Sequence, residues 1–243
     1  MELVDLEEYR QKLAAEGKIG NFFDEYKFRI NQDQEDLIHK LTELKKAIND
    51  GIFSDFSFGK LDSIIFDRHL YKPLIHLTGE SIEVTPVPLN QGEKNFVIDL
   101  RSYFNANRKF FEDKELYLLR NQGRGRGAGF FEANNFHPDF ILWLVTKEKQ
   151  FITFVDPKGL RNTDGLGDPK VEFHLTIKEI EKRLGDPGVV LNSFIISQTP
   201  MNQISWWKDG ITETEFNQHH ILFPLEGDHS YIGKIMAGVL GTE

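Results

Sequence analysis

Apolar and polar positions follow a helical period up to about residue 50 and a mixed pattern beyond it. Two amphipathic stretches, residues 3–16 and 34–48, are rich in Glu, Lys and Leu and predict helices. The aromatic-rich stretch 51–77 is interpreted as a linker and packing element. Residues 81–89 are interpreted as an edge strand, because their prolines would interrupt a central ladder. This pattern predicts a helical N-terminal extension over residues 1–75.

From residue 90 onward the pattern predicts a helix, three strands, a second helix and a fourth strand. The first helix begins near residue 90 and carries one apolar stripe. The expected strands are 115–120, 139–145, 151–156 and 189–197, with the second helix near 175–184. This order predicts an α/β domain over residues 76–243, in which helices flank a mixed central sheet.

Two neighbouring apolar strands carry acidic residues at their outer ends. A four-residue hairpin loop at 146–149 would pair Val145 with Gln150. Counting back along the ladder places Asp139 opposite Asp156. Like charges that face each other across strands are destabilising, so this arrangement calls for a compensating positive charge.

A bound divalent cation could supply this positive charge. Mg²⁺, for example, is typically held by one or two carboxylates together with water. The carbonyl of Pro157 is a possible third ligand, and Lys158 lies near the same face, where an ammonium group can orient water. Asp-Pro-Lys-Gly is equally typical of a type I turn, and both interpretations stay open. A second copy of the tripeptide, at 168–170, follows no apolar strand and is interpreted as a plain turn.

Glu93 offers a third carboxylate, because it shares the apolar stripe of the helix that begins near residue 90. An acid on a core-facing stripe is typical of a site. Asn90 and Glu93 also have the spacing of a capping box, in which the glutamate bonds back to the start of the helix. The residues alone favour the cap.

The composition adds limits to this picture. The chain has 243 residues, 40% of them hydrophobic, no cysteine and a formal charge of −9. Disulfides and thiolate metal sites are therefore excluded, and a cytoplasmic protein without a membrane partner is expected. Residues 101–126 nevertheless hold seven Lys or Arg against three Asp or Glu. Among them, Arg120, Arg124 and Arg126 lie in or beside a glycine-rich loop, which is interpreted either as a solvated loop or as a contact for phosphate groups.

The chain resembles the PD-(D/E)XK nuclease superfamily in two segments, "ELYLLRNQGRGRGAGFFEANNFHPDFILWL" and "FITFVDPKGL". These segments contain Asp139 after Pro138 and the pattern Asp156-x-Lys158. They are similar in particular to the C-terminal endonuclease domain of type III restriction subunits and related DEAD/DEAH helicases. The resemblance spans about residues 80–225. It implies a restriction-endonuclease-like fold and a magnesium-dependent deoxyribonuclease, a hydrolase with Mn²⁺ as a substitute ion.

Carried onto this sequence, the resemblance implies that Asp139 and Asp156 bind the metal and that Lys158 aligns the attacking water. It also raises Glu93 as a catalytic glutamate and metal ligand, with Glu132 as the runner-up. The implied partners are DNA and the helicase, methyltransferase or specificity subunits of a restriction system. No G-x-x-x-x-G-K-[ST] phosphate loop is present in the chain, so a motor domain is not expected within it.

Two further expectations follow. The first is an alternative function, a non-catalytic module of the same fold that binds DNA or a partner subunit. The second concerns aromatic side chains. Trp206 and His137 are expected to pack. His219 and His220 are interpreted as structural, because adjacent residues in a strand point to opposite faces and do not easily share one metal.

Overall fold

The computed structural model describes two compact units, which divide the chain between Lys94 and Asn95. The sequence placed the boundary at residue 75. The structure describes residues 26–30, 34–52, 54–69, 74–78, 82–121, 128–130, 136–157, 160, 163–204, 206, 211–225 and 228–241. The helix expected at 3–16 lies outside these residues, as do Lys158, Arg124, Arg126 and Glu132.

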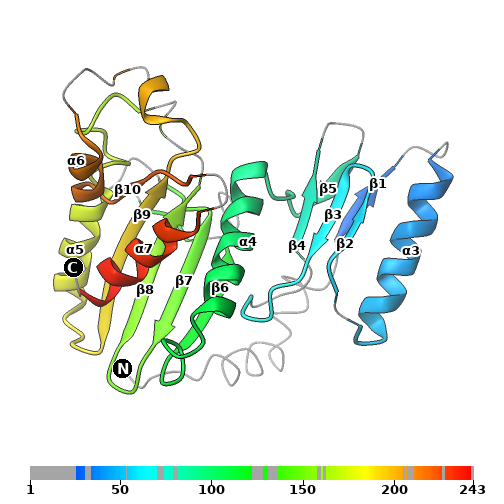
Figure 1. The fold of residues 1–243 in the computed structure, drawn as a ribbon, viewed down its shortest axis with the longest axis horizontal. Helices are drawn as coiled ribbons and strands as arrows, with labels where there is room; N and C mark the ends of the chain where they lie inside the picture. Colours follow the sequence, from blue (N-terminus) through cyan, green and yellow to red (C-terminus); the bar gives the residue numbers. More distant parts are fainter. Residues whose placement is uncertain are drawn as a thin grey trace. The chain divides into compact units, whose positions relative to one another are not determined.

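The N-terminal unit contains strands as well as a helix. Its elements are β1 (Lys27–Arg29), α3 (Glu35–Asn49), β2 (Phe56–Phe58), β3 (Leu61–Ile64), β4 (Leu74–Leu77) and β5 (Glu83–Thr85). Strands β2, β3 and β4 form an antiparallel sheet, and β1 pairs with β5 (Figure 1). The helix expected at 34–48 and the edge strand expected at 81–89 are confirmed as α3 and β5.

The interpretation of residues 51–77 as a linker is wrong, because this stretch supplies β2, β3 and β4. Buried and exposed side chains do not alternate regularly in these short strands. In β3, for example, Leu61, Ser63 and Ile64 are all buried. Three- and four-residue strands are too brief for a period-two signal to stand out in a sequence. The unit therefore has its own small core, which forms beneath α3 around Leu37 and Ile75.

The C-terminal unit has a mixed five-stranded sheet in the order β10-β9-β8-β7-β6. Strands β6 (Glu115–Arg120), β7 (Phe140–Val145) and β8 (Gln150–Asp156) are antiparallel neighbours, whereas β9 (Val189–Ile196) and β10 (Ile221–Leu222) continue the sheet in parallel. Its helices are α4 (Gln91–Ala106), whose first four residues precede the boundary, α5 (Phe173–Leu184), α6 (Glu213–Gln218) and α7 (Ser230–Leu240). The predicted α/β class and the predicted order of elements from residue 90 to 197 are confirmed.

Helices cover both faces of this sheet. Ile141, Phe154 and Leu191 pack with Phe173 and Ile177 of α5 on one face. On the other face, the Phe140 ring lies 5.2 Å from that of Phe96 in α4. Helix α7 packs on β8 and crosses in front of β8 and β9 in Figure 1. Each strand thus has one side toward α5 and the other toward α4 and α7.

None of the helices in the part of the chain that the structure describes is both long and apolar enough to cross a membrane.

Candidate functional site

Asp139 and Asp156 occupy the ends of the β7–β8 hairpin. Thr146 and Lys149 close the turn through a 2.9 Å bond from the Thr146 amide to the Lys149 carbonyl. The observed pairing joins Val145 to Gln150 and Phe140 to Val155. This is the predicted register, and its next step sets Asp139 against Asp156.

Both acids lie on the face of the sheet that α5 covers. Asp139 precedes Ile141 by two residues and Asp156 follows Phe154 by two, and side chains two apart in a strand share a face. The exposed fractions are 8% for Asp139 and 3% for Asp156. Two carboxylates of the same sign are therefore buried at adjacent strand ends, where a positive charge lowers the energy of the pair most effectively.

Among the described residues, Lys170 brings a positive charge to Asp156. Its ammonium nitrogen lies 2.7 Å from Oδ2 of Asp156. The sequence interpretation of 168–170 as a plain turn missed this contact. The segment does turn, but it also carries an ammonium group to the first copy of the motif. No local pattern signals this, because the contact joins a loop to a strand end.

Hydrogen bonds and packing fix the loop that presents Lys170. Asp168 accepts bonds from the Lys170 amide (2.8 Å) and the Asp164 amide (3.1 Å) through its two carboxylate oxygens. The next residue, Val171, is 1% exposed and packs with Leu160 in a core cluster. Lys170 thus leaves an ordered loop, and its ammonium also lies 5.8 Å above the centre of the Phe136 ring.

Glu93 makes both halves of a capping box with Asn90. The Asn90 amide donates to Oε2 of Glu93 at 2.7 Å, and the Glu93 amide donates to Oδ1 of Asn90 at 2.9 Å. The capping interpretation is therefore confirmed. Glu93 belongs to the N-terminal unit and is 2% exposed. Its role as a metal ligand stays a prediction, as does that of the Pro157 carbonyl.

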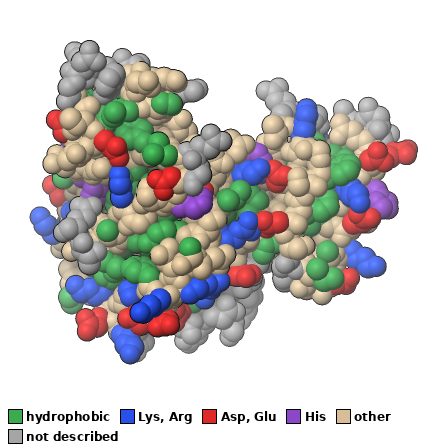
Figure 2. Space-filling view, in the orientation of Figure 1, with side chains coloured by type: hydrophobic (Ala, Val, Ile, Leu, Met, Phe, Trp, Pro, Cys, Tyr) green, Lys and Arg blue, Asp and Glu red, His purple; other side chains and the backbone are tan. Residues whose placement is uncertain are grey.

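Arg120 ends β6 and pairs with Phe140. Cross-strand partners share a face, so Arg120 points to the α4 side, away from the face of Asp139 and Asp156. Its predicted contact with DNA remains a prediction. Figure 2 shows charges of both signs interspersed over the visible face of the molecule.

The aromatic residues expected to pack do so. Trp206 lies against the Leu160–Val171 core cluster and donates from Nε1 to Thr163 at 2.9 Å. The ring of His137 fills the space beside Gly129, where any side chain would overlap it.

The strand interpretation of His219 and His220 is wrong, because both lie in the turn after α6, where His220 has a positive φ of 56°. Their rings lie 5.3 and 5.1 Å from that of His174. Burial, and then the neighbouring histidines, lower the pKa of His174 against the opposing bond to the Val171 carbonyl. Within the described ranges, no three His, Cys, Asp or Glu side chains are grouped so as to hold a metal ion.

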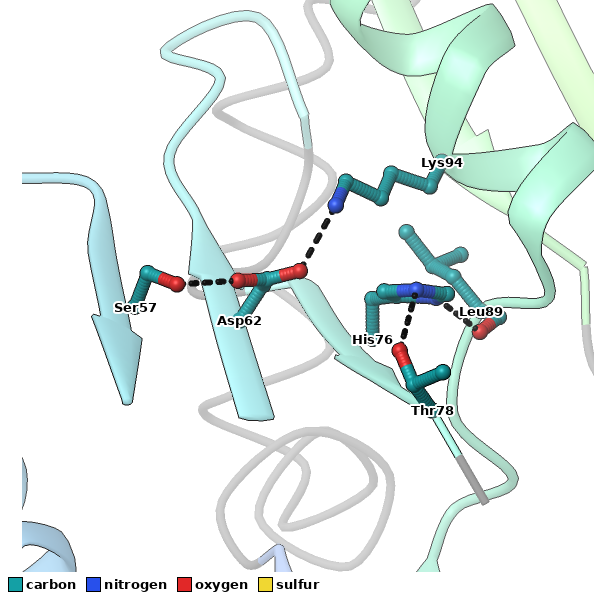
Figure 3. Close-up of polar contacts among 6 residues, drawn as sticks. All are labelled: Ser57, Asp62, His76, Thr78, Leu89 and Lys94. Atoms are coloured by element: carbon teal, nitrogen blue, oxygen red, sulfur yellow. Dashed lines mark hydrogen bonds and ion pairs between the residues drawn. The ribbon is translucent and has the colours of Figure 1, made fainter. Parts of the chain in front are cut away.

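A second polar cluster lies in the N-terminal unit (Figure 3). Asp62 accepts bonds of 2.6 Å from Ser57 and from the Lys94 ammonium, while His76 bonds the Leu89 carbonyl at 2.8 Å. Burial raises the pKa of Asp62, but the bonds from Lys94 and Ser57 outweigh it and hold that pKa below its usual value. The cluster joins Asp62 of β3 to Lys94, which lies in the first turn of α4 and still belongs to the N-terminal unit.

Searches of family models, of curated proteins and of solved structures found no match to this chain.

Proposed function

We propose that this chain is a metal-dependent DNA endonuclease domain that hydrolyses phosphodiester bonds within a restriction or helicase–nuclease defence system. The observation that carries the proposal is the β7–β8 register, which extended by one step sets Asp139 opposite Asp156, two buried acids at adjacent strand ends. Two buried like charges repel each other, and a bound divalent cation would offset that repulsion.

The donor chemistry fits magnesium. Carboxylate oxygens are hard ligands, and one or two of them commonly hold Mg²⁺ or Mn²⁺ with water completing the shell. Asp139 and Asp156 are the residues that would hold the ion. The cation would supply charge stabilisation on the phosphate and a more acidic water. Lys158 is proposed to orient that water, and the Pro157 carbonyl is proposed as a further ligand.

The chain is also proposed to bind the phosphate backbone of DNA. Arg120, Arg124 and Arg126 are proposed to contact phosphates, because guanidinium groups make paired hydrogen bonds with them. Such contacts position the substrate without reading its sequence. DNA is the proposed ligand, with a helicase or methyltransferase subunit as the proposed protein partner.

A specific observation favours a second candidate, a non-catalytic module that binds DNA or a partner subunit. Lys170 already supplies an ammonium group to Asp156 at 2.7 Å. A carboxylate that is permanently neutralised in this way would stabilise the fold without any metal. The two candidates make opposite predictions about cleavage.

Nicking of supercoiled plasmid separates them. We expect cleavage with Mg²⁺ or Mn²⁺ and none with EDTA, and we expect Asp156→Asn to lower the rate by about 10²-fold or more. The exposed Asp164→Asn is the matched control and should cleave like the natural chain. Equal nicking by all samples would point to a contaminant and leave the binding module standing.

A further inference from the structure

The ion pair between Lys170 and Asp156 has the features of a built-in counterion. Asp156 is almost fully buried, and the Lys170 side chain is only 22% exposed. A carboxylate buried without a partner is costly, and removing one member of a buried pair is strongly destabilising. Lys170 therefore stabilises the strand end whenever no other cation is present.

The loop geometry shows that this contact is not a chance surface encounter. The side chain of Asp168 accepts a hydrogen bond from the Lys170 amide, and the following residue, Val171, is anchored in the core. Only the flexible side chain of Lys170 remains to move, because its backbone is fixed on both sides. An ammonium on a four-carbon stem can leave Asp156 without disturbing the loop.

We propose that Lys170 and a divalent cation compete for the Asp139–Asp156 pair, so that cation binding displaces the Lys170 ammonium from Asp156. The inference rests on the proposed metal site and adds a residue that sets its affinity. It follows from charge, because a lysine and a divalent ion within ion-pair distance of one carboxylate repel each other strongly in a poorly screened site. Lys170 offsets one of the two negative charges of the metal-free pair and makes the site bind its ion more weakly than two carboxylates alone would.

Direct Mn²⁺ binding, measured by calorimetry on the full chain, tests the competition. We expect Lys170→Met to bind Mn²⁺ about tenfold more tightly than the natural chain, because one opposing charge is removed. Lys170→Arg, which keeps the charge, should not gain affinity. The matched control is Lys178→Met, which removes a lysine from an ion pair with Glu181 on α5 and should bind like the natural chain.

Two other measurements distinguish competition from a merely structural role. Acetylation of Lys170, followed by peptide mass spectrometry, should rise several-fold on adding Mg²⁺, since the displaced ammonium becomes reactive. In EDTA, Lys170→Met should unfold at a lower temperature than the natural chain. Excess Mn²⁺ should restore the unfolding temperature of the variant, because a ligand that binds the folded state stabilises that state. If the Met variant proves too unstable in EDTA, the acetylation experiment on the natural chain still distinguishes competition from a structural role of Lys170.

The outcomes separate this inference from the proposed function. Unchanged or weaker Mn²⁺ binding by Lys170→Met, or acetylation that ignores Mg²⁺ while Mn²⁺ binds, would overturn the competition but leave the metal site. Binding to Lys170→Met but not to the natural chain would support the competition and overturn the metal-dependent nuclease. Absence of binding by every variant would overturn both.

Discussion

The hydroxyl group of Tyr231 donates a 2.7 Å hydrogen bond to Oδ2 of Asp99, which links α7 to α4 over one face of the sheet. The other oxygen of Asp99 lies 2.9 Å from Nδ1 of His229. Tyr231 is 3% exposed. Burial, and then the bond to Asp99, raise the pKa of the Tyr231 phenol well above its ordinary value.

Removing this hydroxyl group should destabilise the C-terminal unit. We expect Tyr231→Phe to lower the free energy of unfolding by about 1–3 kcal/mol at pH 7, the usual contribution of a buried bond to a charged group. The matched control is Tyr117→Phe, which removes an exposed bond of 2.5 Å to Glu115 and should change stability by less than about 0.5 kcal/mol. Urea unfolding followed by circular dichroism measures both.

The same variant should change the alkaline limb of stability. A raised pKa means that the folded chain keeps the phenol proton at a pH where the unfolded chain has lost it. This contribution is complete below the unfolded value of about 10 and is lost as pH rises above it. Stability of Tyr231→Phe should therefore fall less steeply above pH 10, and identical slopes would contradict the assignment.

Glu93 can be tested for its two roles separately. Glutamine keeps an oxygen for the Asn90 amide, so Glu93→Gln should unfold like the natural chain, whereas Glu93→Ala should lose about 1 kcal/mol. Thermal unfolding measures the difference. We expect Glu93→Gln to retain plasmid nicking, in keeping with a cap. A loss of nicking at unchanged stability would instead support the metal-ligand role that the family resemblance implies.

His174 should make stability sensitive to mild acid. Its folded pKa is lowered mainly by burial, so the unfolded chain binds the proton first as pH falls. The stabilising contribution is present above the unfolded value of about 6.5 and is lost as pH drops toward the folded value. The facing groups that add to this are His219 and His220, while Glu172 opposes it.

His174→Asn removes the ionisation and can still donate to the Val171 carbonyl. We expect the slope of unfolding free energy against pH, measured between pH 5 and 7 by urea unfolding, to fall by up to about 1.4 kcal/mol per pH unit, the value for one proton. The exposed His39→Asn on α3 is the control and should leave the slope unchanged. A slope that His174→Asn does not alter would assign the acid sensitivity to other groups.

DNA affinity should depend on the three arginines unequally. For Arg124→Gln and Arg126→Gln we expect the slope of log K against log salt to fall by about 0.9, the value for one lost phosphate contact. Arg120→Gln should change it less, because Arg120 faces α4 rather than the side of the acids. Fluorescence anisotropy with a short duplex at several salt concentrations measures this, with Arg183→Gln as the control. An Arg120 effect as large as the others would place this residue at the DNA.

Local patterns were enough to predict the elements between residues 90 and 197. Strands 140–145 and 150–156 are long and apolar, and the four-residue loop between them predicted their register. Because a hairpin's pairing follows from its turn, the opposition of Asp139 and Asp156 was readable from the sequence. The short strands β2, β3 and β4 were not, since three or four residues carry too little periodicity.

The sequence by itself determined which acids meet, because neighbours along a hairpin bring them together. Only the tertiary structure decided what faces them: Lys170 arrives from a loop that packing and the Asp168 side chain hold in place. The same holds for His174 with His219 and His220, which meet only after α5 and the turn following α6 pack beside β9. Contacts between distant segments depend on burial summed over the whole unit, and no local period encodes that sum.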